Sequence, residues 1–139
     1  MIERYSHGVI YVLDQEEALA FYTERLGFEL REDATLDEFR WLTVGPPDQP
    51  DLELILIEPG PPMFDPETAE QLKAIVAKGA MGAGALETED CARTYEELRA
   101  RGVEFLTEPT ERSYGIEATL RDNSGNWFSL VQRLEADAD

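Results

Sequence analysis

The chain has 139 residues, of which 42% are hydrophobic, and this length and composition fit one domain with a buried core. Thirty acidic residues against twelve lysines and arginines give a formal charge of −18, which would repel nucleic-acid phosphates and anionic lipids. Neither nucleic acid nor a membrane is therefore expected as a partner. No apolar run approaches the roughly 18 residues of a membrane span, and the N-terminus lacks a signal-peptide pattern, so we expect a cytoplasmic protein. The single cysteine, Cys91, excludes an internal disulfide.

The first part of the chain predicts a strand, a helix and three further strands. Residues 5–13 are rich in Val, Ile and Tyr, as in a strand. Asp14 has the character of an N-cap, apolar residues then recur at helical spacing, and Gly27 ends the predicted helix. The further strands are predicted at residues 28–31, 40–44 and 51–57, with an acidic turn between the first two.

A connecting segment follows, in which several prolines interrupt regular structure. Asp65 is placed to cap a helix, with Pro66 at its first position and Gly79 just after its end. The earlier pattern then returns, with a strand, a helix capped by Asp90 and ending at Gly102, and another strand. A final hairpin is predicted from residues 116–121 and 127–132, joined by the turn at residues 122–126.

The order strand, Asp-capped helix, glycine, strand and hairpin thus occurs twice, and such an internal repeat constrains the fold. We predict an α+β fold in which two modules form a curved, partly closed mixed sheet with helices outside. One domain would span residues 1–139. Module one would cover about 5–58, a connecting segment with a helix about 59–80, and module two about 82–133.

Several short motifs in this order resemble those of a known superfamily. They are DQEEALAFY at residues 14–22 with LGF at 26–28, YEEL at 95–98 with RGV at 101–103, and RD with SGN at 121–126. The resemblance, which spans residues 5 to about 133, is to the vicinal oxygen chelate superfamily: glyoxalase I, extradiol dioxygenases, and fosfomycin and bleomycin resistance proteins. It implies a pair of βαβββ modules and often a homodimer. It also implies a cleft metal held by the first and last strands of each module.

Carried over position by position, the resemblance places only half of that metal site. The first-strand position, seven before Asp14, is His7, and the last-strand position is Glu53. The corresponding residues of module two are Ala83 and Ser129, neither of which supplies the expected ligand. The alternation of strand side chains independently puts Glu53 on the opposite face from its leucine neighbours.

Two interpretations of this half-site stay open. His7 and Glu53 would suit a divalent metal such as Zn, Ni, Co, Mn or Fe, with Glu87 or a bound substrate as a third ligand. Alternatively, a His–Glu hydrogen bond lines a pocket that holds no metal. Cys91 follows the predicted cap Asp90, but the acidic residues nearby oppose a reactive thiolate.

Side chains that share a predicted face with the half-site, or that border the cleft in the resembled family, are candidates to line a ligand pocket. Core packing is the alternative role of each aromatic residue, and Arg121 could clamp a carboxylate or pair with a surface acid. These candidates are Tyr11, Trp41, Ile55, Tyr114, Arg121, Trp127 and Ser129.

The functional hypothesis is a small-molecule-binding protein of the resistance or sequestration type, with an incomplete metal site and a preference for cationic ligands. The alternative is a metal-dependent lyase or dioxygenase-like enzyme that uses His7, Glu53 and an unusual third ligand. A purely regulatory or scaffolding dimer is a third possibility, which the sequence does not separate from the first.

Overall fold

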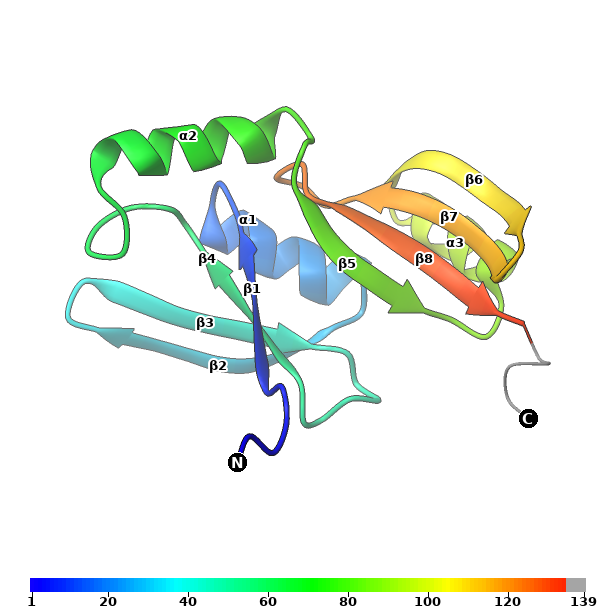
Figure 1. Cartoon of the computed structure of the whole chain (residues 1–139), viewed down its shortest axis with the longest axis horizontal. Helices are drawn as coiled ribbons and strands as arrows, with labels where there is room; N and C mark the ends of the chain where they lie inside the picture. Colours follow the sequence, from blue (N-terminus) through cyan, green and yellow to red (C-terminus); the bar gives the residue numbers. More distant parts are fainter. Residues whose placement is uncertain (135–139) are drawn as a thin grey trace.

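The computed structural model describes residues 1–134, which fold into two similar halves (Figure 1). The first half contains β1 (His7–Tyr11), α1 (Gln15–Ala20), β2 (Glu29–Leu36), β3 (Phe39–Gly45) and β4 (Glu53–Ile57). The helix α2 (Pro66–Ala77) connects the halves. The second half contains β5 (Gly82–Glu87), α3 (Cys91–Ala100), β6 (Glu104–Arg112), β7 (Gly115–Arg121) and β8 (Trp127–Arg133). The predicted pair of βαβββ modules is confirmed.

Each module forms one four-stranded mixed sheet. The strand orders are β1-β4-β3-β2 and β5-β8-β7-β6, so the same topology occurs twice. In each sheet the first strand runs parallel to the last, and the other neighbours are antiparallel. The helix between the first two strands supplies the crossover that a parallel pair requires. Because the sheets do not join into one barrel, β1 and β5 are edge strands.

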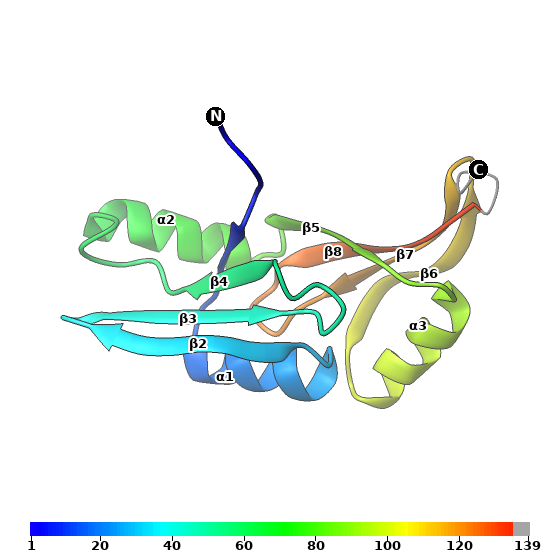
Figure 2. The ribbon, with the colours of Figure 1, turned by 90° about the horizontal axis from the view of Figure 1, so that it is seen from below.

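The helices leave one side of the sheets largely free. Figure 2 shows α1 and α3 on one side, while α2 lies on the opposite side near β1. Strand side chains that point toward α1 and α3 form one core shared by both modules. Its largest fully buried members are Tyr22, Phe128, Leu42, Leu56 and Leu120. No helix in the described part of the chain is long and apolar enough to cross a membrane.

The three predicted helix caps are confirmed. The carboxylate Oδ1 of Asp14 accepts a hydrogen bond from the backbone N–H of Glu17 at 2.9 Å. Asp65 and Asp90 do the same for the third residue after each, at 2.7 and 3.0 Å. Each such cap stabilises a helix by about 1 kcal/mol. The first helix is more irregular than predicted, because a π-helical segment, Phe21–Arg25, follows α1.

Two strands are longer than the sequence predicts. Residues 32–36, expected as an acidic turn, belong to β2, and β6, the strand predicted after Gly102, is nine residues long and continues to Arg112. Both are edge strands with mostly exposed side chains. Charged residues protect such edges from pairing with other chains, and they also obscure the alternation by which a strand is recognised. The actual β2–β3 turn is at residues 37–38, where Asp37 has a φ of 57°.

The turn at residues 122–126 binds module two to module one. The Tyr22 hydroxyl donates to Asp122 Oδ2 at 2.7 Å, and Asn126 Nδ2 donates to the backbone oxygen of Tyr11 at 2.8 Å. The Ser124 hydroxyl accepts from the backbone N–H of Leu13 at 3.0 Å. Asp122 also accepts three backbone N–H groups within its own turn. These buried hydrogen bonds fix the orientation of the two sheets.

Candidate functional site

The face of the first sheet that points away from α1 carries a mixed apolar and polar surface. In β1, Ile10 is buried toward α1, so its neighbours Val9 and Tyr11 point to the other side. Val9 pairs with Ile55 across the parallel ladder and is 48% exposed, whereas Ile55 is 8% exposed. We call this surface the open face. It consists of His7, Val9, Tyr11, Trp41, Thr43, Glu53, Ile55 and Ile57.

Two aromatic contacts bound the apolar strip of the open face. At one end the rings of His7 and Trp41 lie 5.7 Å apart, centroid to centroid, at 53°. At the other end Tyr11 meets Phe64 edge to face, also at 5.7 Å. Phe64 belongs to the segment after β4, where its backbone N–H donates to Gly60. The strip therefore has a pair of aromatic rings at each end, against which a flat ligand could pack its own rings.

Polar side chains gather around His7. Its Nε2 lies 3.5 Å from Glu53 Oε2, because His7 and Glu53 are directly paired in the β1–β4 ladder. Its other nitrogen, Nδ1, lies 2.9 Å from the Ser6 hydroxyl. Glu32 on β2 completes the group: one donor atom each from His7, Glu32 and Glu53 lies within 4.8 Å of the others.

Thr43 holds the Glu53 carboxylate in place. The Thr43 hydroxyl donates to Glu53 Oε1 at 2.7 Å and accepts from the Glu32 backbone N–H at 3.0 Å. The bond from Thr43 is the largest of the effects that lower the pKa of Glu53, and a hydrogen bond with the Glu32 side chain and the charges of His7 and Arg31 lower it further. Glu53 is therefore ionised at neutral pH, with Oε2 turned toward His7.

The second sheet does not supply the other half of the expected metal site. The residue opposite Ser129 is Ala85. The spacing from Asp90 predicts Ala83 at this position, but a register irregularity between Gly82 and Gly84 shifts the pairing. Neither alanine carries a ligand. Glu87, the predicted third ligand, lies at the end of β5 and pairs with Arg133 at 3.7 Å. The three-residue group near His7 contains Glu32 instead.

The remaining candidates lie on the second sheet. Trp127, 37% exposed, packs on Gly82, where a Cβ would come within 2.8 Å of the indole ring. Arg121 Nη1 lies 3.5 Å from Glu104, so its guanidinium already has an acidic partner. Tyr114 is exposed at the tip of the β6–β7 hairpin, where its hydroxyl donates to Glu117. The structure thus gathers Tyr11, Trp41 and Ile55 on the open face and places Tyr114, Arg121, Trp127 and Ser129 in the other module.

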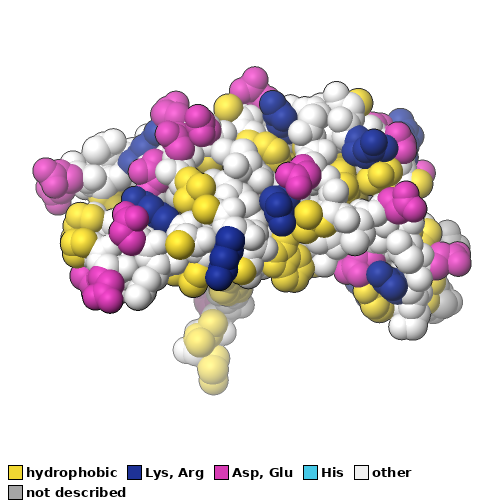
Figure 3. All heavy atoms as spheres, turned by 90° about the horizontal axis from the view of Figure 1, so that it is seen from above, with side chains coloured by type: hydrophobic (Ala, Val, Ile, Leu, Met, Phe, Trp, Pro, Cys, Tyr) yellow, Lys and Arg dark blue, Asp and Glu magenta, His cyan; other side chains and the backbone are white. Residues whose placement is uncertain are grey.

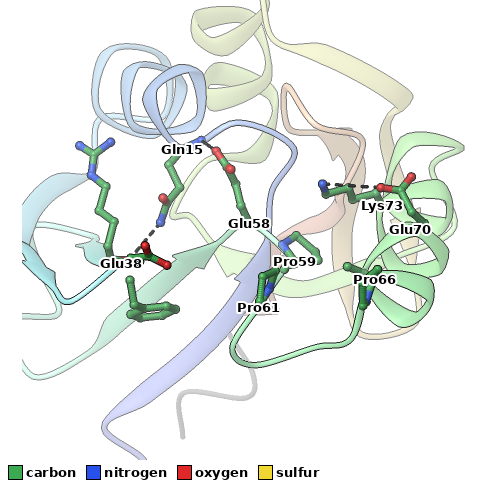
Figure 4. A pocket seen from close by; sticks show the side chains of 12 residues that line it. Gln15, Glu38, Glu58, Pro59, Pro61, Pro66, Glu70 and Lys73 are labelled. Atoms are coloured by element: carbon green, nitrogen blue, oxygen red, sulfur yellow. Dashed lines mark hydrogen bonds and ion pairs between the residues drawn. The ribbon is translucent and has the colours of Figure 1, made fainter.

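A separate cavity of about 430 Å³ lies between α2, the end of β4 and the start of β3. Figure 4 shows Gln15 in its wall, with its side chain bonded to the backbone oxygen of Arg40 and its backbone N–H bonded to Glu58. The Gln15 side chain also donates to the backbone oxygen of Leu56. The Lys73 amine lies 3.9 Å from Glu70. Most polar groups of this cavity are thus satisfied within the protein, which favours a structural role.

Neither the charge nor the cysteine marks a further site. Figure 3 shows acidic side chains scattered over one face of the molecule, with arginines, lysines and apolar patches between them. Cys91 is fully buried, and desolvation raises the pKa of its thiol, opposed by a backbone hydrogen bond from Ala118. A buried thiol with a raised pKa is a poor nucleophile.

Sequence reasoning missed Glu32 and Thr43. Glu32 lies in the stretch predicted as a turn, so its side chain could not be assigned to a face. Once β2 is extended, its pairing with Thr43 puts Glu32 beside the open face. The one sequence signal that could have located Glu32 and Thr43 is the possible antiparallel pairing of residues 28–36 with residues 39–45 across the exposed turn.

Comparisons with known proteins agree with this geometry. The family model described as "Glyoxalase/Bleomycin resistance protein/Dioxygenase superfamily" matches residues 4–130. The uncharacterized protein YurT of Bacillus subtilis (strain 168) is 38% identical over 124 residues, which are 89% of this chain and 94% of YurT. The crystal structure of UcmS2 is 53% identical, with a TM-score of 0.91 over 95% of this chain and 99% of UcmS2. TnmS3, an antibiotic binding protein from Streptomyces sp. CB03234, is 29% identical, with a TM-score of 0.76 over 96% of this chain and 98% of TnmS3.

Proposed function

This chain belongs to the Glyoxalase/Bleomycin resistance protein/Dioxygenase superfamily, and we propose that it is a small-molecule-binding member of the resistance or sequestration type. The observation that carries this proposal is the open face. There, Val9 and the two aromatic pairs leave apolar surface accessible on the side of the sheet that α1 does not cover. Ligand sites are lined mainly by apolar and aromatic side chains with a few convergent polar groups, and the open face has this composition.

The chemistry of the open face favours a flat, largely apolar ligand that carries a cationic or hydrogen-bond-donating group. Its flat part would pack on Val9 and Ile55 between the two aromatic pairs. Its donor group would approach Glu53, whose Oε2 is not used by Thr43. The formal charge of −18 adds a long-range attraction for cations.

The relationship to TnmS3 supports this proposal. TnmS3 is described as an antibiotic binding protein, and the similarity extends over 96% of this chain. An antibiotic or a related metabolite is therefore the first ligand class to examine.

A cytoplasmic homodimer is part of the proposal. Val9 on the open face is 48% exposed in the single chain, and the edge strands β1 and β5 each have one neighbour in their sheets. A second copy would cover apolar surface and enclose a ligand more completely. Sedimentation-velocity ultracentrifugation tests this part, and a monomer at micromolar concentration would contradict it.

Isothermal titration calorimetry with two probes tests ligand binding. Doxorubicin is a planar aromatic molecule with an amine, and bleomycin is a basic glycopeptide. We expect micromolar or tighter binding of at least one probe and at least tenfold weaker binding after Trp41→Ala, a loss of about 1.4 kcal/mol. Leu106→Ala, a truncation of an exposed leucine on β6, is the control and should leave binding unchanged. The proposal fails if neither probe binds, or if both variants bind equally weakly.

A metal-dependent lyase or dioxygenase-like enzyme is a second candidate function, because His7, Glu53 and Glu32 lie close together. One imidazole and two carboxylates fit divalent Zn, Ni, Co, Mn or Fe. In such an enzyme a bound metal would act as a Lewis acid on an oxygen of the substrate. His7→Ala should then abolish both metal uptake and turnover, and retention of either would exclude this candidate.

A further inference from the structure

We infer that a cavity at the junction of the two modules is a second small-molecule site, which takes a small zwitterion of the amino-acid type. The cavity has a volume of about 470 Å³ and lies between the helical residues 17–25 and the start of β6 (Figure 2). None of the described residues that line it belongs to the open face. The inference therefore concerns a site other than that of the proposed function, and neither depends on the other.

One wall of the cavity comes from α1 and from the π-helical segment Phe21–Arg25. At the end of this segment the backbone N–H of Leu26 donates to the backbone oxygen of Phe21, five residues back, at 3.2 Å. The segment contributes Phe21, Glu24 and Arg25 to the wall. Short π-helical turns are rare and occur frequently at functional sites, so this irregularity in the helix coincides with the cavity for which a function is sought.

The charged groups of the cavity are divided between its two walls. Glu17 and Glu24 belong to the helical wall, and no ion pair among residues 1–134 involves either of them. Arg25 instead reaches across to module two, where its Nη1 donates to the backbone oxygen of Gly102 at 3.1 Å. A Cβ at Gly102 would come within 2.7 Å of this nitrogen, so the guanidinium lies directly against the backbone of module two.

Arg121 adds a second guanidinium on the side of module two. Its Nη1 lies 3.5 Å from Glu104 Oε2, and its Nε is buried without a hydrogen-bond partner in the described part of the chain. Asp122 also lines the cavity, but its carboxylate is already bonded to Tyr22 and to its own turn. Module two thus offers guanidinium donors for a carboxylate, while the helical wall offers carboxylates for an amine.

A ligand that carries both charges suits this arrangement better than a simple anion or cation. An anion would face the two glutamates of the helical wall, and a cation would face the two guanidiniums. An α-amino acid carries an ammonium and a carboxylate group at neutral pH, so it can satisfy both walls at once. Its side chain would pack on Ala20 and Phe21, the apolar part of the lining. An aromatic side chain supplies the largest apolar contact there.

Titration of the full, nitrogen-15-labelled chain with L-phenylalanine, followed by HSQC spectra, tests this inference. We expect a Kd below about 1 mM and shift changes at the backbone amides of Gly102 and Asn123, which line the cavity. Two further probes keep the phenyl group and remove one charge each: phenethylamine lacks the carboxylate, and 3-phenylpropionate lacks the ammonium. Each should bind at least about fivefold more weakly, because charge-assisted hydrogen bonds are lost.

Exposed residues of the helical wall provide variants that should fold. Glu24→Gln and Arg25→Gln should each weaken the binding of L-phenylalanine at least about fivefold. Their matched controls, Glu96→Gln on α3 and Arg112→Gln at the end of β6, remove the same charges elsewhere and should change the affinity by less than about twofold. Trp41→Ala, on the open face, should leave this binding unchanged. Circular dichroism melting verifies that each variant is folded.

Several results would overturn the inference: no binding of L-phenylalanine, equal or tighter binding of either singly charged probe, an equal loss of affinity in the controls, or shift changes confined to the open face. A protein that binds doxorubicin or bleomycin but not L-phenylalanine would contradict only this inference. One that binds L-phenylalanine in the cavity but neither doxorubicin nor bleomycin would contradict only the proposed function.

Discussion

Replacing Tyr22 with Phe tests whether the buried contact between the modules stabilises the fold. The Tyr22 ring is fully buried, and its hydroxyl donates to Asp122 Oδ2 at 2.7 Å. Phe keeps the ring and removes only the hydroxyl, so no large cavity forms. Asp122 keeps its bond from Asn126 Nδ2 and three backbone N–H bonds, so its carboxylate stays largely satisfied.

The expected cost follows from the type of hydrogen bond. A bond to a charged group contributes about 1.5–3 kcal/mol. Because Asp122 retains its other donors, we expect Tyr22→Phe to lower the free energy of unfolding by about 2 kcal/mol. For a chain of this length that corresponds to a drop in Tm of roughly 6–8 °C.

Urea denaturation followed by tryptophan fluorescence and by circular dichroism measures this change. Tyr95→Phe is the matched control: the Tyr95 ring packs against Phe105 at 4.7 Å, and its hydroxyl has no partner among the described residues. We expect the control to change stability by less than about 0.5 kcal/mol. A similar loss in both variants, or none in Tyr22→Phe, would refute the assigned role of the contact.

The same variant has a distinct dependence on pH. Burial, the charge of Asp122 and the hydrogen bond to it raise the pKa of Tyr22 well above its usual 10.0. The folded state therefore holds this proton more tightly than the unfolded state. The resulting stabilisation is complete below about pH 10 and is lost as the pH rises toward the folded-state pKa. Tyr22→Phe should show a smaller alkaline loss of stability than the wild-type chain.

Three further predictions concern single residues. Thr43→Val removes the hydrogen bond that contributes most to lowering the pKa of Glu53. A lowered pKa in the folded state stabilises the fold above about pH 4.5, and this stabilisation is lost as the pH falls. In urea titrations the variant should therefore lose less stability than the wild-type chain between pH 7 and pH 3. Cys91 should react with a thiol reagent such as DTNB only after unfolding, and fast labelling of the native chain would contradict its burial. Gly125→Ala should destabilise the fold by about 2 kcal/mol or more, because the φ of Gly125 is +122° and a Cβ there would come within 2.2 Å of a backbone oxygen of α2. Gly60→Ala is the control: a Cβ at Gly60 would have nothing within 4 Å, so thermal melts should show that this variant is tolerated.

Local chemistry made much of the fold predictable. Aspartate caps and closing glycines act within one helical turn, so Asp14, Asp65 and Asp90 could be assigned without knowledge of the tertiary structure. The repeat of these signals, together with the resemblance, predicted the paired βαβββ modules. The alternation of residues 52–57 also put Glu53 on a face away from its leucine neighbours, and that face now lies beside His7.

Edge strands were less predictable, and with them the third member of the polar group. Exposed residues of β2 and β6 carry charges that keep the edges soluble, so their hydrophobic alternation is weak. The sequence therefore predicts a turn at Glu32. The sequence offers Glu87, or a bound substrate, as a third ligand because Glu87 alternates correctly along β5, yet alternation says nothing about the distance between two sheets.

The sequence by itself determined the modules, the helix caps and the strand face on which each central residue lies, because these depend on chemistry within a few residues. The tertiary structure alone decided which faces meet. Strand register brought Glu53 opposite His7, the β2–β3 hairpin brought Glu32 beside both, and the buried turn at Asp122 set the angle between the sheets. These placements depend on contacts between residues up to about a hundred positions apart, which no local pattern encodes.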